Sequence, residues 1–299
     1  METRQLGKTD MQVSVLGFGG VEIDGASLAD VEQLLGSALD AGINVIDTAE
    51  CYGESEDVIG RAVASRRSDY FLFTKCGHAD GDELPDYPEW DPRLLTASIE
   101  RSLRRLRTDH VDLLQLHSCS LDVLRKGDVI KVLEKAKREG KTRYIGYSGD
   151  NEDARYAIHT GAFDTLQTSV NIADQQEIDF TIPAAREKDM GIIAKRPIAE
   201  SVWLQENPQK SDYAYPYWER LQTLKYDFLE SGSATSIATA LRFTLSVPCV
   251  DVAILGTRSA EHMRQNIAML SVGNLSADEF NAIRALWEQR ADQHWLGQV

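Results

Sequence analysis

Eight short and almost continuous apolar runs recur along this chain, and segments with apolar residues at helical spacing lie between them. The runs are SVLGFG, INVID, FLFTK, VDLLQLH, RYIGYS, DTLQTSV, GIIAK and VDVAIL. A strand with one face in water alternates apolar and polar residues, whereas near-continuous runs are typical of strands buried on both faces. The pattern therefore predicts a parallel sheet that is covered by helices.

The helical segments have apolar residues three and four positions apart. In the first of them Val31, Leu34, Leu35 and Ala38 share one face, and Ser27 stands where it can cap the helix. The predicted helices cover about 28–41, 55–66, 92–107, 122–139, 151–160, 175–188, 233–246 and 259–271. A glycine just past a helix is expected to end it in the left-handed conformation, and such glycines are Gly42, Gly140, Gly161 and Gly191.

The alternation of eight strands with eight helices predicts an α/β fold of the (β/α)8 TIM barrel type, as one domain over residues 1–299. An open doubly wound sheet is the alternative, but the GFGG of the first run lacks the glycine spacing of that fold's nucleotide-binding turn. We expect residues 1–12 to form a hairpin that closes the barrel floor. A long aromatic-rich loop at 197–232 is expected after the seventh strand, and a last helix at 277–290.

The composition and net charge of the chain argue against some classes of binding partner. The 299 residues carry a formal net charge of -15, which repels nucleic acid and anionic membrane surfaces, so neither is expected as a partner. No stretch approaches the roughly 18 apolar residues of a membrane span and the N-terminus is polar, so we expect a cytoplasmic protein. The four cysteines lack C-x-x-C spacing and the histidines lack paired spacing, so we expect reduced thiols and no metal site.

Polar residues directly after the apolar runs are the candidates for chemistry, because active sites of such barrels lie at the C-terminal ends of the strands. Asp47, Lys75 and His117 each end a run, and Tyr52 lies five residues beyond Asp47. Two further polar residues in this kind of position are Ser148 and Asn171. In a closed barrel these side chains converge on one pocket.

The first four residues make chemical sense together. A lysine ammonium favours the phenolate form of a nearby tyrosine and lowers its pKa, and a carboxylate keeps the lysine charged and oriented. With an imidazole that binds the same oxygen, the set predicts a general acid tuned towards neutral pH. Such a group suits protonation of the oxyanion that forms when hydride reaches a carbonyl carbon. Taken alone, Lys75 could instead be a Schiff-base nucleophile, as in barrel aldolases.

Five segments resemble the aldo-keto reductase superfamily, namely GINVIDTAECYGESEDVIGRAV at 42–63, FLFTKCG at 71–77, VDLLQLHS at 111–118, RYIGYSGDN at 143–151 and LGTRSAEHMRQN at 255–266. The resemblance implies a (β/α)8 barrel that carries a nicotinamide cofactor without a Rossmann domain. It also implies that Tyr52 is the general acid, that Lys75 tunes it, that Asp47 pairs with Lys75 and that His117 orients the carbonyl.

The resemblance extends to the cofactor residues. Ser148 and Gln167 fall where the family hydrogen-bonds the nicotinamide carboxamide. The family's adenosine-phosphate motif falls on Gly256, Arg258, His262 and Asn266. A guanidinium near the first turn of the eighth helix is a good phosphate site, so Arg258 favours NADPH as the cofactor, with NADH as the alternative.

The sequence departs from the family at three of these positions. His262 replaces the motif's glutamine, and Gly149 replaces the asparagine that often follows the serine. The seventh strand ends in Ala194–Pro197, which offers no aromatic residue to stack on the nicotinamide.

The function implied is NAD(P)H-dependent reduction of a small-molecule aldehyde or ketone, or oxidation of the matching alcohol or sugar. Because some proteins with this fold are channel-associated subunits that hold cofactor, a binding subunit is the alternative. The pattern names neither the substrate nor the oligomeric state. We expect each of four tryptophans to line the substrate mouth or to pack a loop onto the barrel, namely Trp90, Trp203, Trp218 and Trp295. A solvated acidic loop is expected to contain His78, Asp80, Asp82 and Glu83.

Overall fold

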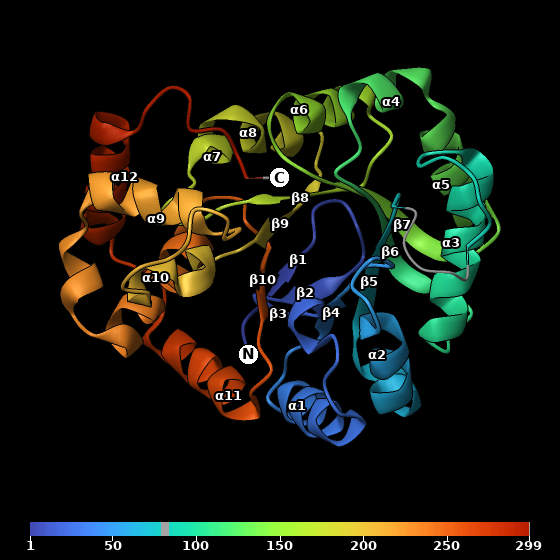
Figure 1. Cartoon of the computed structure of the whole chain (residues 1–299), viewed down its shortest axis with the longest axis horizontal. Helices are drawn as coiled ribbons and strands as arrows, with labels where there is room; N and C mark the ends of the chain where they lie inside the picture. Colours follow the sequence, from blue (N-terminus) through green and yellow to red (C-terminus); the bar gives the residue numbers. More distant parts are fainter. Residues whose placement is uncertain (79–83, 299) are drawn as a thin grey trace.

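The computed structural model describes residues 1–78 and 84–298, and within them eight parallel strands close into a barrel (Figure 1). The hydrogen-bonded order around the barrel is β10-β3-β4-β5-β6-β7-β8-β9. The strands are β3 (Leu16–Gly19), β4 (Val45–Asp47), β5 (Phe71–Cys76), β6 (Val111–His117), β7 (Thr142–Ser148), β8 (Thr165–Ser169), β9 (Gly191–Lys195) and β10 (Val252–Gly256). The predicted (β/α)8 barrel is confirmed, and its closure excludes the open doubly wound sheet.

Helices surround the barrel (Figure 1). They include α1 (Leu28–Asp40), α2 (Ser55–Val63), α3 (Pro92–Arg105), α6 (Asn151–Thr160), α10 (Ser233–Ser246), α11 (Ala260–Met269) and α12 (Ala277–Arg290). The apolar face predicted for α1 is buried, and the Ser27 hydroxyl caps it by accepting from the backbone N–H of Asp30. Ser276 and Glu279 form a reciprocal capping box at the start of α12.

Two segments predicted as single helices are each broken in two. The segment 122–139 is α4 (Leu121–Lys126) and α5 (Asp128–Arg138), because Gly127 between them adopts a φ of 75° and ends the first helix. The segment 175–188 is α7 (Gln176–Phe180) and α8 (Ile182–Arg186). Pro183 in the first turn of α8 has no N–H for a hydrogen bond back into α7, which explains this break.

Gly191 does not end a helix in the left-handed conformation as predicted. That conformation falls two residues earlier, on Asp189, which has a φ of 53°. Gly191 instead opens β9 and makes room for the hairpin below it, because a Cβ atom there would lie 2.6 Å from Cγ of Leu6. The requirement for glycine at this position is therefore one of close packing.

The N-terminal hairpin of β1 (Thr3–Gln5) and β2 (Gln12–Ser14) closes the barrel floor, as predicted. Leu6, Met11 and Val13 are fully buried against side chains inside the barrel. The inward residues that they meet are Val45, Phe73, Leu113, Ile193, Val252 and Ile254. The interior is thus a packed core below the mouth, which leaves the carboxyl ends of the strands for chemistry.

Four polar side chains at the floor repeat a single type of bond around the barrel. Each lies at or just before the start of an even-numbered strand and accepts the backbone N–H of a residue that lies in the preceding strand or two positions before it. The pairs are Asn44 with Ser14 at 2.7 Å, Asp112 with Leu72 at 2.9 Å, Asp164 with Ile145 at 3.0 Å and Asp251 with Ile192 at 2.9 Å. These side chains join β4 to β3, β6 to β5, β8 to β7 and β10 to β9.

The segment predicted as a long loop at 197–232 contains helical structure. It comprises the 3₁₀ helices η3 (Ala199–Leu204) and η4 (Asp227–Glu230), with α9 (Tyr215–Leu224) between them. Its aromatic residues pack onto the loop after β8, as expected from their number: the Tyr217 hydroxyl lies 3.3 Å from Asp174 Oδ2, and the Tyr226 hydroxyl 3.0 Å from the carbonyl oxygen of Ile172.

The segment after α12 runs back across the barrel mouth, and the C-terminus lies near the centre of the view in Figure 1. The carbonyl oxygen of Leu296 accepts a 2.6 Å hydrogen bond from Arg220, and the N–H of Gln298 donates to Asp174 at 3.1 Å. Among the residues that the structure describes, no helix combines the length and apolar character needed to cross a membrane.

Candidate active site

The carboxyl ends of β4, β5 and β6 bring the four predicted catalytic residues together. Asp47 ends β4, Lys75 is the second-last residue of β5 and His117 ends β6. Tyr52 lies in the turn between β4 and α2. All four line one cavity of about 770 Å³ at the barrel mouth.

Lys75 and Asp47 form a buried ion pair at the base of this cavity. Lys75 Nζ lies 2.6 Å from Asp47 Oδ2 and 2.8 Å from the carbonyl oxygen of Thr48. Burial acts to lower the pKa of Lys75, but the charges of Asp47 and Tyr52 outweigh burial and raise it. The lysine therefore stays an ammonium, and its Nζ lies 5.0 Å from the centre of the Tyr52 ring.

The pKa of Tyr52 is shifted in the direction opposite to the one predicted. Burial raises it above the ordinary value of 10.0 and is the largest effect. Lys75 lowers the pKa, as expected, while Asp47 raises it. In the protein without ligands burial outweighs the ammonium, so Tyr52 keeps its proton at neutral pH and is a proton donor rather than a base.

His117 is neutral and its ring position is constrained by neighbours. Burial lowers its pKa well below the ordinary value of 6.5, and the charge of Lys75 adds to that effect. Its Nδ1 lies 3.4 Å from Cys51 Sγ, and its ring meets the Tyr52 ring edge-on at 5.6 Å. When the Cys51 thiol donates to Nδ1, the ring proton is on Nε2, where it can be donated to a ligand oxygen.

Gln115 is a buried member of the site that the sequence pattern did not reveal. Its Nε2 lies 3.3 Å from Asp47 Oδ1 and 3.4 Å from Gln167 Oε1, so it links the ion pair to a predicted cofactor residue. It stands inside the apolar run of β6, two positions before His117. Because strand side chains alternate, that spacing places it on the same face as His117, which is the signal that could have identified it.

The predicted cofactor residues divide into two groups. Those that line the same cavity as Tyr52 are Ser148, Gln167, Gly256 and Arg258. His262 and Asn266 lie in α11 and are not among the residues that line it. The cavity thus extends from the tetrad to the start of the eighth barrel helix.

Arg258 spans the far end of the cavity. Its Nε donates to the carbonyl oxygen of Glu22 and its Nη2 to that of Asp24, the latter at 2.9 Å. These carbonyls belong to the loop around the 3₁₀ helix η1 (Val21–Ile23), which also contributes to the lining. A guanidinium has five N–H groups, so these two contacts hold part of it and leave other N–H groups for a phosphate.

The segment 197–232 contributes one aromatic residue to the cavity lining. Tyr213 lines the cavity, and the guanidinium of Arg196 lies 4.9 Å from the centre of its ring. The carboxylate of Asp150, the residue after Gly149, is bonded within the fold. It pairs with Lys195 at 2.8 Å and accepts a hydrogen bond from the Thr168 hydroxyl at 2.7 Å.

Several other candidates lie outside the cavity lining. Asn171 closes a turn with Asp174. None of the four candidate tryptophans, Trp90, Trp203, Trp218 and Trp295, is among the lining residues. Trp203 donates to Ser236 at 3.0 Å and Trp295 packs on Trp287, so these two fasten loops. Of the acidic loop only His78 can be placed, because Asp80, Asp82 and Glu83 lie outside the described residues.

A family model described as the aldo/keto reductase family matches residues 15–288. An uncharacterized oxidoreductase of Bacillus subtilis (strain 168), YqkF, is 27% identical over 305 residues, covering 97% of each chain. An L-galactose dehydrogenase of Arabidopsis thaliana is 27% identical over 315 residues, covering 99% of this chain and 97% of the relative. The holo form of aldo-keto reductase AKR11C1 from Bacillus halodurans is similar with a TM-score of 0.83 at 26% identity, covering 96% of each chain.

Proposed function

Because the chain belongs to the aldo/keto reductase family, we propose that it transfers hydride between NADPH and the carbonyl carbon of a small aldehyde or ketone, with Tyr52 as the general acid. The reverse reaction is oxidation of the matching alcohol or sugar. The observation that supports this most directly is the Lys75–Asp47 pair next to a protonated Tyr52, with neutral His117 in the same cavity.

The cavity lining fits a nicotinamide dinucleotide. Ser148 and Gln167 offer a hydroxyl and an amide for the carboxamide at the tetrad end, and Arg258 offers a guanidinium for a phosphate at the other. When bound, the cofactor supplies the hydride. Tyr213 would present its ring to the nicotinamide in place of an aromatic residue at the strand end. His262 and Asn266 lie further along and would reach only the adenosine end.

The tetrad then handles the proton and the oxygen. His117 donates from Nε2 to the carbonyl oxygen and orients the carbonyl. As hydride reaches the carbon, the C=O π bond breaks and the oxygen takes the phenol proton of Tyr52. Lys75 stabilises the phenolate that remains, and Asp47 holds the ammonium in place. Tyr52 regains its proton from solvent before the next turnover.

The same geometry disfavours a Schiff-base role for Lys75. A nucleophilic amine must be neutral, whereas Lys75 donates to Asp47 and to the carbonyl oxygen of Thr48, and its pKa is raised. Both contacts favour the ammonium form. We therefore assign Lys75 an electrostatic role in a reductase rather than a covalent one in an aldolase.

The test is a panel of aldehydes, ketones and sugar alcohols with NADPH, NADP, NADH and NAD, monitored by the absorbance of the reduced nicotinamide. We expect carbonyl-dependent oxidation of NADPH that is lost in Tyr52→Phe. Tight binding of NADPH with no turnover of any carbonyl would contradict the proposal and favour a cofactor-holding binding subunit.

A further inference from the structure

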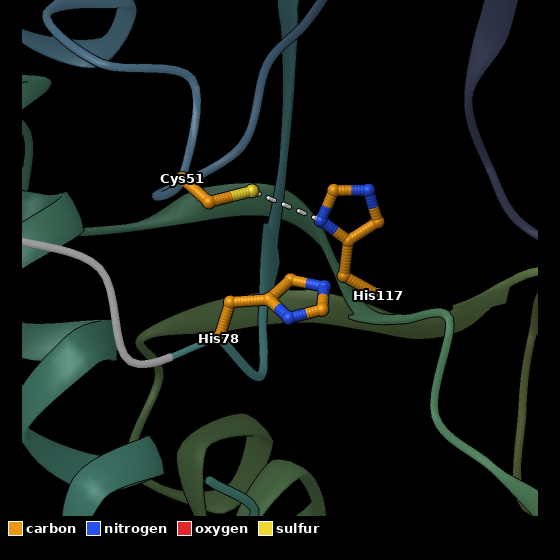
Figure 2. A group of neighbouring side chains, drawn as sticks. All are labelled: Cys51, His78 and His117. Carbon is orange, nitrogen blue, oxygen red and sulfur yellow. Dashed lines mark hydrogen bonds between the residues drawn. The ribbon is translucent and has the colours of Figure 1, made fainter. Parts of the chain in front are cut away.

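Two loop residues converge on His117, a member of the tetrad. Cys51 follows β4, His78 follows β5 and His117 ends β6, and Figure 2 shows the thiol and both rings directed towards one another. One potential ligand atom from each residue lies within 4.8 Å of the other two. All three residues are partly exposed, so the cluster is not sealed off from solvent.

The spacing of this cluster is close to that of a tetrahedral metal site. Zinc bonded to sulfur at about 2.3 Å and to nitrogen at about 2.05 Å places the sulfur and nitrogen about 3.6 Å apart and two nitrogens about 3.3 Å apart. Cys51 Sγ already lies 3.4 Å from His117 Nδ1. The two imidazole rings meet edge-on with their centres 5.1 Å apart. A small side-chain adjustment would therefore bring all three ligand atoms onto one ion.

A carboxylate lies near one ring nitrogen of His78, as it does for many metal-binding histidines. Its Nδ1 lies 3.6 Å from Glu89 Oε1, and its backbone N–H donates to Glu50 Oε1 at 3.0 Å. At that distance Glu89 makes a charge contact rather than a hydrogen bond, and its place beside Nδ1 leaves Nε2 as the nitrogen for the metal. Gly77 lets Trp90 pack against the backbone next to His78, because a Cβ atom there would lie 2.3 Å from the indole ring.

We propose that Cys51, His78 and His117 form a binding site for a zinc-class divalent transition metal ion, and that the ion inhibits the reductase reaction. One thiolate and two imidazoles are the borderline-soft ligands that Zn²⁺ and Co²⁺ accept, and three protein ligands leave a fourth position for water. Coordination replaces the thiol proton of Cys51. The bond from Nδ1 of His117 to the ion moves this ring, and with it the Nε2–H that would orient the substrate carbonyl.

Cobalt is the probe that reports the ligands directly, because a thiolate bonded to Co²⁺ has a near-ultraviolet charge-transfer absorption that a water-bonded ion lacks. Titration of the purified protein with Co²⁺ should produce this band with one ion per chain, and Zn²⁺ should abolish it by displacement. Cys51→Ser should lack the band. Loss of a contact that supports a metal ligand costs about 10–100-fold in metal affinity. We expect His78→Asn, which removes a ligand itself, to weaken Zn²⁺ binding by at least that much.

The matched controls are Cys249→Ser and His159→Asn, which alter an exposed cysteine and a histidine away from the cluster. Both should bind Co²⁺ as the wild type does. Absence of the band in the wild type, or its persistence in Cys51→Ser, would overturn the site and leave the contact between Cys51 and His117 as a hydrogen bond only. These readouts need no substrate, so they stand whether or not the proposed reductase activity is found.

Inhibition is the second arm and rests on the proposed function. Zn²⁺ should lower carbonyl reduction by the wild type, and a chelator should restore it. His78→Asn should need at least about tenfold more Zn²⁺ for the same loss. Equal inhibition of wild type and His78→Asn would show that the inhibitory ion binds elsewhere, and would overturn the inhibitory role.

Discussion

Lys75 Nζ lies 2.6 Å from Asp47 Oδ2, and only 2% and 3% of these two residues is exposed. Neither charge can be removed without leaving the other buried without its main partner, at a cost of several kcal/mol. The pair therefore couples the two residues, and mutations of either one act through the same contact.

The first prediction concerns Tyr52. Tyr52→Phe keeps the ring and its packing and removes only the hydroxyl. We expect turnover to fall by about 10²–10⁴-fold, the usual contribution of a positioned general acid, with nearly unchanged NADPH affinity. Steady-state kinetics and fluorescence titration with NADPH measure the two quantities. Retention of most of the activity by the pure variant would refute the assignment.

The second prediction concerns the ion pair. Lys75→Met and Asp47→Asn should each lower turnover. Their effects should not add in the double variant, because Asp47 acts through the ammonium that Lys75→Met removes. The measurement is a double-mutant cycle on kcat/KM, with far-ultraviolet circular dichroism to confirm folding. Losses that multiply would show that the two residues act independently.

The third prediction concerns Arg258 and the choice of cofactor. A charge-assisted contact to the 2'-phosphate is worth roughly 1.5–3 kcal/mol. The carbonyl oxygens of Glu22 and Asp24 already hold two of the five guanidinium N–H groups, so fewer of them can bind the phosphate and the gain is smaller. We therefore expect Arg258→Ala to weaken NADPH binding by about tenfold, equivalent to about 1.4 kcal/mol, and to leave NADH nearly unaffected.

The difference between the two cofactors is the control for Arg258, since only NADPH carries the extra phosphate. The effect on NADPH should shrink as salt is raised, because the lost contact is ionic. Equal weakening of NADPH and NADH, or a preference of the wild type for NADH, would contradict a role in 2'-phosphate binding.

The fourth prediction concerns pH and Asp174. Burial raises the pKa of this carboxyl to about 7 from an ordinary 3.8, although Arg220 acts to lower it. The folded protein therefore keeps a proton that the unfolded chain has lost between about pH 4 and pH 7. The Asp174 contribution to the free energy of unfolding should accordingly fall as pH rises through this window, by at most about 1.4 kcal/mol per pH unit.

Asp174→Asn is the matched variant, because the amide oxygen can still accept from Tyr217 and from the N–H of Gln298. Urea denaturation of both proteins at pH 5, 6, 7 and 8 gives the difference in free energy of unfolding. This difference should change with pH in favour of the variant and level off above about pH 8. A constant difference would contradict the raised pKa of Asp174.

The fold and the tetrad could be predicted from the sequence because both depend on local pattern. A polar residue that ends an apolar run identifies a position at the barrel mouth, and this placed Asp47, Lys75 and His117 correctly. Gln115 was missed because it lies within such a run, and its contacts with Asp47 of β4 and Gln167 of β8 form only across the interior of the closed barrel. The net pKa shift of Tyr52 was missed because burial is a property of the folded protein.

Other features of the structure also lie beyond what the apolar periodicity can show. Cys51, His78 and His117 share no local spacing, and only closure of the barrel brings their loops together. Gly127 was read as part of one long helix, since the apolar pattern continues on both sides of it, whereas its left-handed backbone divides α4 from α5. Contacts across the mouth, such as those of Arg258 with Glu22 and Asp24, cannot be read from periodicity.

The repeated bonds at the floor have a consequence for motion. Asn44, Asp112, Asp164 and Asp251 each hold the backbone N–H of a residue at or near the preceding strand, which groups the eight strands into four pairs. The two strands of a pair can separate at the base only when this bond breaks. Each pair should therefore move as a unit when the barrel loosens. Amide hydrogen exchange at the four donor residues, Ser14, Leu72, Ile145 and Ile192, would record separation within each pair and should therefore be slow.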